Sequence, residues 1–380
     1  MNFNLTREQE MIVKVVREFA ENEVGPIAAE IDETQEFPRE NVKKMAELNM
    51  MGIPFSKEYG GAGGDFLTFM MCLEEIAKKC AATTAMLAVH TIPCWLLTNF
   101  GTEAQKRKYL TPLLKGEHLG AFALTEPNAG TDSASQTSVA YLDGDHYVLN
   151  GQKCFITNGG EADTYLVFAM TDKSKGNKGI TGFIIEKDFP GFYIGKKENK
   201  MGIRASATTE LIFKDCIIPK ENLFGKEGQG FKYAMKALDG GRIGMAAQAV
   251  GIAQGAIDET VKYLNQRQQF GKPIGTFQGL QWMLAEMETR VNAARLLVHK
   301  AASKMDNKEA FGKDASMAKL FASQTAMYVT TEAVQLHGGY GYMKDYPLER
   351  MMRDAKITEI YEGTSEVQKM VISRYVLDNK

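Results

Sequence analysis

The hydrophobic pattern of this chain changes its period twice, and these two changes restrict the fold more than any single motif does. Apolar residues recur at helical spacing through roughly the first hundred residues. From about 120 to 220 the pattern becomes that of short strands, and from about 228 onward long helical stretches return. The sequence therefore predicts an α+β multidomain fold, with a helical domain, a β domain and a second helical domain in that order.

The first domain is predicted to be all-α and to cover residues 1–118. Thr6-x-x-Gln9 has the spacing of a capping box, and the apolar residues that follow it trace one helical face as far as Phe19. Gly25-Pro26 interrupts that helix. Phe66 to Lys79 repeats the helical pattern less cleanly, because the acidic Glu74 falls on its apolar face.

The second domain is predicted to cover 119–227 and to be an antiparallel β-barrel or sandwich. Asp143-Gly144 separates two apolar runs and is a strong hairpin signal. Further runs rich in β-branched and aromatic residues lie at 164–171, 180–185 and 210–218. No helix-length amphipathic segment separates these runs, which argues against a doubly wound parallel sheet.

The third domain, 228–380, is predicted to be a four-helix bundle. Phe231 to Leu264, Thr276 to Lys304 and Asp314 to Leu336 each exceed twenty residues and interleave small with apolar side chains. The chain contains no βαβ unit carrying G-x-G-x-x-G, so a Rossmann dinucleotide domain is not expected.

Charge and cysteine usage narrow the class of protein. The formal net charge is −2, and residues 231–380 carry 20 Lys+Arg against 16 Asp+Glu, a surplus of four positive charges. That surplus is too small to suggest a nucleic-acid partner. The five cysteines form no Cys-x-x-Cys pair, so no metal site is expected and a reducing compartment is favoured.

The N-terminus and the hydropathy favour a cytoplasmic protein. Residues 1–10 do not combine a basic region with an apolar run, so no signal or transit peptide is expected. No uninterrupted stretch of 18 apolar residues occurs, so no membrane span is expected.

The segment from Asp354 to Gln368 carries the strongest functional signal. It has the pattern of a helix that ends at Gly363 and restarts at a capping box, Ser365-x-x-Gln368. Glu362 then lies in the gap between two helices, among apolar neighbours, where loss of water would raise the pKa of its carboxyl toward that of a general base. Taken alone, the segment favours the plainer alternative, in which Glu362 is a solvated residue at a helix end, because buried carboxylates are rare.

Five other segments combine hydroxyl, aromatic, arginine or glycine residues in patterns that suit a ligand. Each also has a plain structural reading, as a turn, core packing, a surface ion pair, a connector or a helix stop. Within the third of them, Asp239 and Arg242 would lie on neighbouring turns of one helix face, where they could pair. The segments are Leu124-Thr-Glu-Pro-Asn-Ala-Gly-Thr-Asp132, Phe155-Ile-Thr-Asn-Gly159, Leu238-Asp-Gly-Gly-Arg-Ile243, Arg267-Gln-Gln-Phe-Gly-Lys-Pro273 and Gln335-Leu-His-Gly-Gly-Tyr-Gly341.

Together these segments resemble the acyl-CoA dehydrogenase family, especially its short-chain, butyryl-CoA type from bacteria. They occur in order and at fitting separations between about 120 and 370, and Ile360-Tyr-Glu-Gly-Thr364 completes the set. Each motif is weak alone, but jointly they are specific. The resemblance implies a flavoenzyme that binds FAD between the β domain and the C-terminal bundle, exchanges electrons with electron-transferring flavoprotein and assembles as a homotetramer, a dimer of dimers.

The resemblance also implies roles for individual residues. Glu362 matches the catalytic base, and Thr125 and Thr157 match hydrogen-bond partners of the flavin ring, with Phe155 against that ring. The remaining FAD contacts that it implies are Phe122, Leu124, Gly130, Thr131, Ile156, Arg267, Phe270, Gln278, Gln335, Leu336, His337, Gly338, Gly339, Thr364, Ser365 and Glu366. The implied substrate contacts are Thr131, Asp239, Arg242, Tyr361 and Gly363. The contacts from 267 to 339 would go to the adenosine diphosphate half of an FAD on a neighbouring subunit.

The implied reaction removes an α-proton of an acyl-CoA to Glu362 and its β-hydride to flavin, which gives the trans-2-enoyl-CoA. The same site could reduce a short or aryl-substituted enoyl-CoA, so the direction stays open, as do an oxygen-using oxidase and a non-catalytic scaffold. Acyl-chain length also stays open; His90 to Leu97 are candidates for the pocket floor by position, and Trp95 would shorten the pocket if it points inward.

Overall fold

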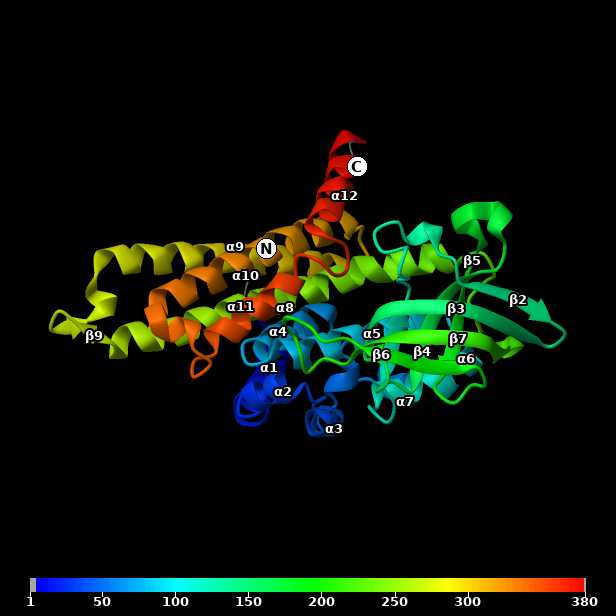
Figure 1. The fold of residues 1–380 in the computed structure, drawn as a ribbon, viewed down its shortest axis with the longest axis horizontal. Helices are drawn as coiled ribbons and strands as arrows, with labels where there is room; N and C mark the ends of the chain where they lie inside the picture. Colours follow the sequence, from blue (N-terminus) through cyan, green and yellow to red (C-terminus); the bar gives the residue numbers. More distant parts are fainter. Residues whose placement is uncertain (1–4, 379–380) are drawn as a thin grey trace.

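The computed structural model describes residues 5–378 and contains the three parts that the sequence predicts (Figure 1). The β-sheet lies at one end of an elongated molecule and the long helices extend to the other end, with the N-terminal helices packed against both. The C-terminal helix projects away from the body. The predicted fold class is therefore confirmed.

The N-terminal part consists of helices, of which α4 and α5 pack against the long helices of the C-terminal part. Thr6 caps the first helix, and the side chain of Gln9 bonds back to the Thr6 amide, so the predicted capping box is present. The Asp306 carboxylate accepts hydrogen bonds from the amides of Phe66 (2.8 Å) and Leu67 (3.0 Å), which ties this part to the bundle. The helices are α1 (Arg7–Phe19), α2 (Ala28–Thr34), α3 (Arg39–Glu47), α4 (Phe66–Ala77), α5 (Ala81–Phe100), α6 (Glu103–Gln105) and α7 (Thr111–Leu114).

Helix α5 is long and apolar enough to cross a membrane by length and composition alone, although the sequence predicted no such span. Of its most apolar window, 89% is buried inside the protein. Such burial is what the core helix of a folded domain shows, and no other helix within residues 5–378 passes the same test.

The β part is one eight-stranded sheet in which most neighbouring strands are antiparallel. The hairpin predicted at Asp143-Gly144 joins β2 to β3. Two contacts are parallel, β1 with β4 and β2 with β4, so the sheet is mixed. The order is β6-β7-β3-β2-β4-β5-β8, with β1 beside β4. The strands are β1 (Gly120–Ala123), β2 (Val139–Asp143), β3 (His146–Thr157), β4 (Thr164–Met170), β5 (Ile180–Glu186), β6 (Phe192–Lys197), β7 (Thr208–Pro219) and β8 (Leu223–Phe224).

The C-terminal part is built on one helix of 37 residues, α8, which at about 1.5 Å per residue is about 55 Å long. It reaches from the sheet to the opposite end of the molecule, where a small hairpin turns the chain back (Figure 1). Helices α9 and α10 lie along it, and α11 packs on α8 and α10. The elements are α8 (Gly230–Gln266), β9 (Gln268–Gln269), β10 (Lys272–Pro273), α9 (Gln278–Asp306), α10 (Gly312–His337), α11 (Leu348–Ile357) and α12 (Ser365–Leu377).

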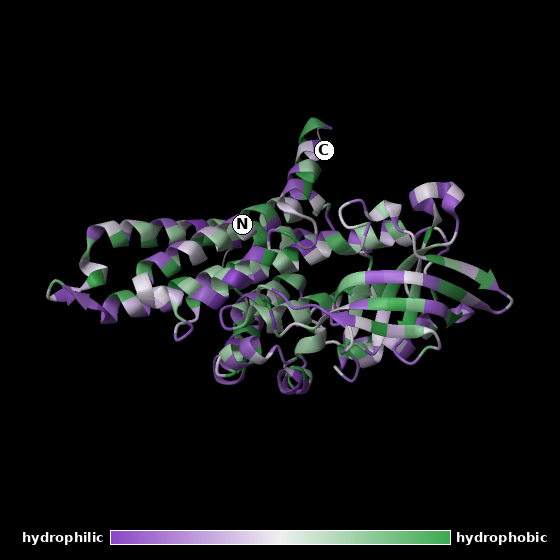
Figure 2. Ribbon diagram, in the orientation of Figure 1, coloured by the Kyte–Doolittle hydropathy of each residue, from purple (hydrophilic) through white to green (hydrophobic). Residues whose placement is uncertain are grey.

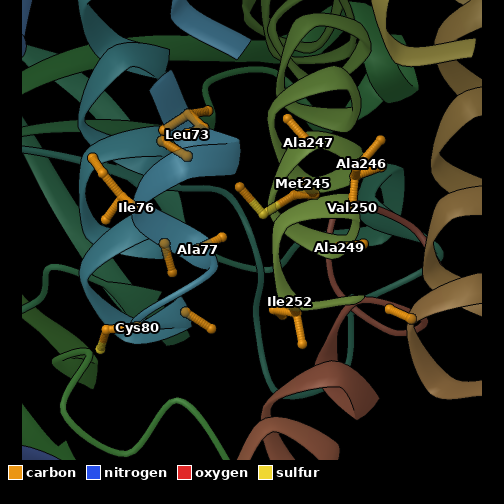
Figure 3. Packing of buried hydrophobic residues seen from close by; sticks show 14 of the residues in the cluster. Leu73, Ile76, Ala77, Cys80, Met245, Ala246, Ala247, Ala249, Val250 and Ile252 are labelled. Atoms are coloured by element: carbon orange, nitrogen blue, oxygen red, sulfur yellow. The ribbon is translucent and has the colours of Figure 1, made fainter. Parts of the chain in front are cut away.

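Small residues let α4 and α8 approach closely in the main core. A Cβ atom at Gly251 would lie 2.4 Å from the Glu74 carbonyl oxygen, and one at Gly255 would lie 2.4 Å from that of Lys78. Figure 3 shows Leu73 and Ile76 of α4 facing the α8 residues Met245 to Ile252. In Figure 2 the long helices carry hydrophobic and hydrophilic residues in alternating stripes. Close packing of this kind fixes the position of α8, on which the candidate site is built.

Glu74 lies on the buried face of α4 because it has a partner there. Its carboxylate accepts hydrogen bonds from Arg295 Nε at 3.0 and 3.1 Å. A buried, paired carboxylate explains the acidic residue that interrupts the apolar pattern of the sequence.

Candidate active site

The chain turns sharply between α11 and α12, at the point that the sequence predicts. Helix α11 ends at Ile357 and α12 begins at Ser365. Glu362 has φ 53° and Gly363 has φ 94°, so both lie in the left-handed region, which a non-glycine residue adopts rarely. Two consecutive left-handed residues break the helix and turn the Glu362 side chain away from the path of α11.

The cap that restarts the helix differs from the prediction. Thr364, and not Ser365, is the N-cap of α12, and its hydroxyl accepts a hydrogen bond from the Val367 amide. The side chain of Gln368 instead donates to the carbonyl oxygens of Glu362 (3.2 Å) and Gly363 (2.8 Å). The predicted Ser365-x-x-Gln368 capping box is therefore wrong by one residue, because Gln368 is used to hold the turn.

One oxygen of the Glu362 carboxyl is shielded from water, while the residue as a whole is half-buried. Its Oε2 atom is buried and has no hydrogen-bond partner within the described residues. Burial raises the pKa of this carboxyl to about 7, although the positive charges of Arg242 and Lys319 oppose the rise. The alternative that Glu362 is a solvated residue at a helix end does not agree with this environment.

The carboxyl borders an apolar pocket between α4, α5 and α8. A Cβ atom at Gly241 would lie 3.0 Å from Glu362 Oε2 and 3.5 Å from Ile92 Cδ1, so the carboxyl, α8 and α5 meet at one point. The cavity measures about 30 Å³. Thr91, Ile92 and Trp95 line it, as the position of His90 to Leu97 suggested, while His90 itself lies elsewhere, between the Leu113 carbonyl and the Gly120 amide. The other lining residues are Phe66, Phe69, Met70, Ala88, Ala237, Gly240, Gly241, Gly244 and Met305.

Asp239 and Arg242 form the ion pair that the helical spacing allows. Arg242 Nη1 donates to Asp239 Oδ1 at 2.6 Å, and Arg242 Nε lies 3.4 Å from the Glu362 carbonyl oxygen. Arg242 is buried, and burial raises the pKa of the Asp239 carboxyl. The pair therefore links α8 directly to the turn that carries Glu362.

The loop that follows β1 rests on a buried ion pair that the sequence did not reveal. Lys153 is fully buried in β3, and its Nζ donates to Glu126 Oε1 (2.8 Å), to the Leu124 carbonyl (3.0 Å) and to Gln136 Oε1 (3.1 Å). Lys153 and its positive charge lower the pKa of the Glu126 carboxyl to about 2, against the effect of its burial. This network holds the segment that includes Thr125 against the sheet.

Three family models match successive segments that together make up most of the chain. The model of the N-terminal domain of acyl-CoA dehydrogenases matches residues 6–117, that of the middle domain 121–216 and that of the C-terminal domain 228–377. The chain belongs to the acyl-CoA dehydrogenase family.

Individual members of the family are similar over almost their whole length. A short-chain specific acyl-CoA dehydrogenase of Clostridium acetobutylicum is 64% identical over 374 residues, which is 98% of this chain and 99% of that protein. An acryloyl-CoA reductase (NADH) of Anaerotignum propionicum is 56% identical and aligns with 99% of this chain and 96% of its own length. The structure of butyryl-CoA dehydrogenase from Megasphaera elsdenii superposes with a TM-score of 0.98 at 51% identity, covering 99% of this chain and 100% of that one.

The residues around Phe155 occupy two different environments in this family member. Phe155 is 65% exposed and has φ 58°, at a point where the register between β3 and β7 shifts. Ile156 points into the core of the sheet, so its side chain is not available to a ligand, whereas Thr157 is half-buried. Leu124 and Phe122 likewise pack in a hydrophobic core, while Thr125 is half-buried and Gly130 and Thr131 are exposed.

A second group of predicted FAD contacts lies far from Glu362. Arg267 follows α8, 25 residues beyond Arg242, which corresponds to about 37 Å along a helix. It lies over the Tyr340 ring at 5.4 Å, beside the end of α10. A Cβ atom at Gly338 or Gly339 would meet nothing within 4 Å, so this backbone is open. Phe270, Gln278 and Gln335 are exposed at this end, whereas Leu336 and His337 are buried, with His337 stacked on Tyr263.

The remaining predicted contacts lie on the turn itself. Tyr361 is half-buried and donates a hydrogen bond to Gln248, Thr364 is half-buried and Glu366 is exposed. Ser365 is buried, and its hydroxyl has no partner within the described residues. Within residues 5–378, no group of three His, Cys, Asp or Glu residues is placed so that it could hold a metal ion.

Proposed function

We propose that this chain is an FAD-dependent dehydrogenase of short-chain acyl-CoA thioesters in which Glu362 removes the α-proton. One observation carries the proposal: a carboxyl with a raised pKa, whose buried Oε2 has no hydrogen-bond partner within the described residues, lies beside an apolar pocket at a helix break. A pKa of about 7 suits a general base that works near neutral pH. The products are the trans-2-enoyl-CoA and reduced cofactor, with electron-transferring flavoprotein as the expected electron partner.

The residues of the turn hold the base at the carbon from which it removes the proton. The α-C–H of a thioester is a weak acid, so its removal requires a base that is held rigidly at the carbon. Arg242 and Gln368 hold the Glu362 carbonyl, and the apolar pocket excludes water from the carboxyl. FAD, when bound, supplies the acceptor for the β-hydride.

The flavin end of the cofactor fits the residues of the β part. Thr125 and Thr157 are half-buried and offer hydroxyls, Phe155 offers an exposed aromatic face, and the buried Ser365 hydroxyl has no partner within the chain. These are the groups that a planar, polar ring system would satisfy. We therefore assign them to the flavin, with Thr131, Asp239, Arg242, Tyr361 and Gly363 toward the CoA thioester.

The adenosine diphosphate end requires a second subunit. Arg267, Gln278 and the open backbone at Gly338 and Gly339 suit a diphosphate, but one extended FAD cannot reach them and Glu362 in the same chain, because about 37 Å of α8 separates the two groups. The exposed Phe270 (93%) and Trp282 (66%) at this end favour contact with another copy. We propose a homo-oligomer, a tetramer as dimer of dimers.

The shape of the pocket favours a short acyl chain. Phe66, Phe69, Trp95 and Met305 are bulky, and the cavity that they enclose measures only about 30 Å³. A butyryl group therefore suits the pocket better than a long chain.

A panel of acyl-CoA thioesters tests this function. We expect butyryl-CoA to bleach the yellow flavin band under anaerobic conditions, and chains of ten or more carbons to bleach it at least about tenfold more slowly, since each methylene that finds no room loses its burial energy. Absorbance at the flavin band in a rapid-mixing instrument gives the rates. Bleaching by no acyl-CoA would contradict the proposed function, and equal rates for all chain lengths would contradict the short-chain assignment.

The activity should depend on pH through Glu362. The carboxyl must be ionised to accept a proton, and its pKa is raised to about 7, so kcat/KM should fall as the pH drops through 7 and reach a plateau above about 8. The pH profile of kcat/KM with butyryl-CoA and a dye as electron acceptor gives the midpoint. A midpoint near 4.5 would mean that the carboxyl is solvated in the working enzyme.

The reverse reaction is the second candidate. The acryloyl-CoA reductase relative carries out a reduction, and a site that holds base and cofactor for dehydrogenation also serves to reduce an enoyl-CoA. The rate at which butyryl-CoA bleaches the oxidised flavin, compared with the rate at which crotonyl-CoA reoxidises the reduced flavin, shows which direction the enzyme favours. Fast reoxidation by air without a protein acceptor would favour an oxidase instead.

We further propose domain boundaries at 118/119 and 227/228 and a cytoplasmic location.

A further inference from the structure

Lys319 is a fully buried lysine in the first third of α10, next to the turn that carries Glu362. Its Nζ donates a hydrogen bond to the Gly363 carbonyl oxygen at 2.7 Å. A buried ammonium is costly unless it is paired, and no carboxylate within residues 5–378 lies in ion-pair distance of it. The position therefore calls for an explanation in terms of the neighbouring turn.

The turn is held by side chains from three different helices. Lys319 of α10 and Gln368 of α12 both donate to the Gly363 carbonyl, and Gln368 and Arg242 of α8 approach the Glu362 carbonyl. Glu362 is a non-glycine residue with positive φ, a conformation that costs free energy unless the surrounding contacts hold it. Lys319 and Gln368 thus share one carbonyl, but only Lys319 carries a charge.

The charges around Glu362 give Lys319 a second role. Of the two cations that act on the carboxyl, Arg242 is already paired with Asp239 at 2.6 Å. Lys319 has no such partner, and its strongest charge interaction is with Glu362, while Glu359 and Glu366 act on it more weakly. Burial lowers the pKa of Lys319 to about 8, so it remains mostly protonated at pH 7.

We propose that Lys319 is a positioning residue for the base: its ammonium fixes the Glu362–Gly363 turn through the Gly363 carbonyl and supplies the positive charge that keeps the Glu362 carboxyl ionised near neutral pH. This inference rests on the proposed function of Glu362 and goes beyond it. Burial alone would push the carboxyl toward its neutral form, which cannot accept a proton, and a nearby unpaired cation opposes that effect.

Two variants that lose a donor to the same carbonyl separate charge from structure. Lys319→Met removes the donor and the charge, whereas Gln368→Met removes a donor and no charge. For Lys319→Met we expect the midpoint of the kcat/KM profile to rise by about one pH unit, which lowers kcat/KM about tenfold at pH 6 and less than about twofold at pH 9. For Gln368→Met we expect kcat/KM to fall by the same factor at every pH, so that the midpoint of the profile does not move.

The experiment uses full-length, FAD-loaded protein, with flavin absorbance and the thermal midpoint measured for each variant. A Lys319→Met midpoint equal to that of the wild type, or an equal shift in Gln368→Met, would overturn the proposal. Should Lys319→Met not fold, Lys319→Arg decides, because the proposal requires that it keep the wild-type midpoint. The proposed function fails separately, if the wild type dehydrogenates no acyl-CoA or Glu362→Gln is fully active.

Discussion

Replacing Glu362 with Gln should lower turnover of butyryl-CoA by roughly 10²–10⁴-fold, the range that a positioned general base contributes. The amide has the shape of the carboxyl but cannot accept the α-proton. Because Glu362 makes no side-chain hydrogen bond that its loss would break, the variant should fold and stay yellow with bound FAD. Steady-state rates with a dye acceptor, normalised to flavin absorbance, measure the effect.

Glu359→Gln is the matched control for this change. Glu359 lies three residues earlier on the same turn, but its carboxylate pairs with Lys356 at 2.6 Å near the surface. We expect its turnover to remain within about twofold of the wild type, since surface ion pairs contribute little. Similar losses in both variants would mean that the turn is sensitive to any substitution and that Glu362 has no special part.

Replacing Lys153 with Met should destabilise the protein by about 3–5 kcal/mol, because it leaves the buried Glu126 carboxylate without its cation. The same change releases the Leu124 carbonyl and Gln136, so the loop that carries Thr125 loses its support. We therefore expect weaker FAD retention as well as a lower unfolding midpoint. Urea unfolding and the flavin content after gel filtration measure the two effects.

Adding Glu126→Gln to Lys153→Met should recover part of the lost stability. The double variant removes the unpaired charge, and the Gln side chain can still accept a hydrogen bond from the Thr137 amide, as Glu126 does. If the double variant is as unstable as the single one, then the cost comes from lost packing and not from the stranded carboxylate.

Much of the fold could be predicted because period and turn signals are local. The capping box at Thr6, the hairpin at Asp143-Gly144 and the long helices all agree with the structure. The parallel pairing of β1 with β4 could not be predicted, since 40 residues separate the two strands and nothing in either one specifies its partner. The apolar character of α5 was likewise uninformative until its burial between the other elements was known.

The site divides in the same way. The helix break at Glu362 and the pairing of Asp239 with Arg242 follow from spacing along one segment. Lys153 and Lys319 were missed because their partners come from other elements. The sequence did contain a signal for Lys319: this lysine lies among the small residues Ser316, Ala318 and Ala322 of α10, all of which are buried. Thr364 and Ser365 both have hydroxyls that can cap a helix, so the sequence pattern does not distinguish which of them is the N-cap of α12.

Anaerobic rapid mixing of the FAD-loaded protein with butyryl-CoA tests the central claim most directly, because loss of the yellow band reports the arrival of the hydride without any electron partner. We predict fast bleaching by the wild type and, at the same flavin content, bleaching at least about a hundredfold slower by Glu362→Gln. Equal bleaching rates in the two proteins would contradict the account of Glu362 as the base.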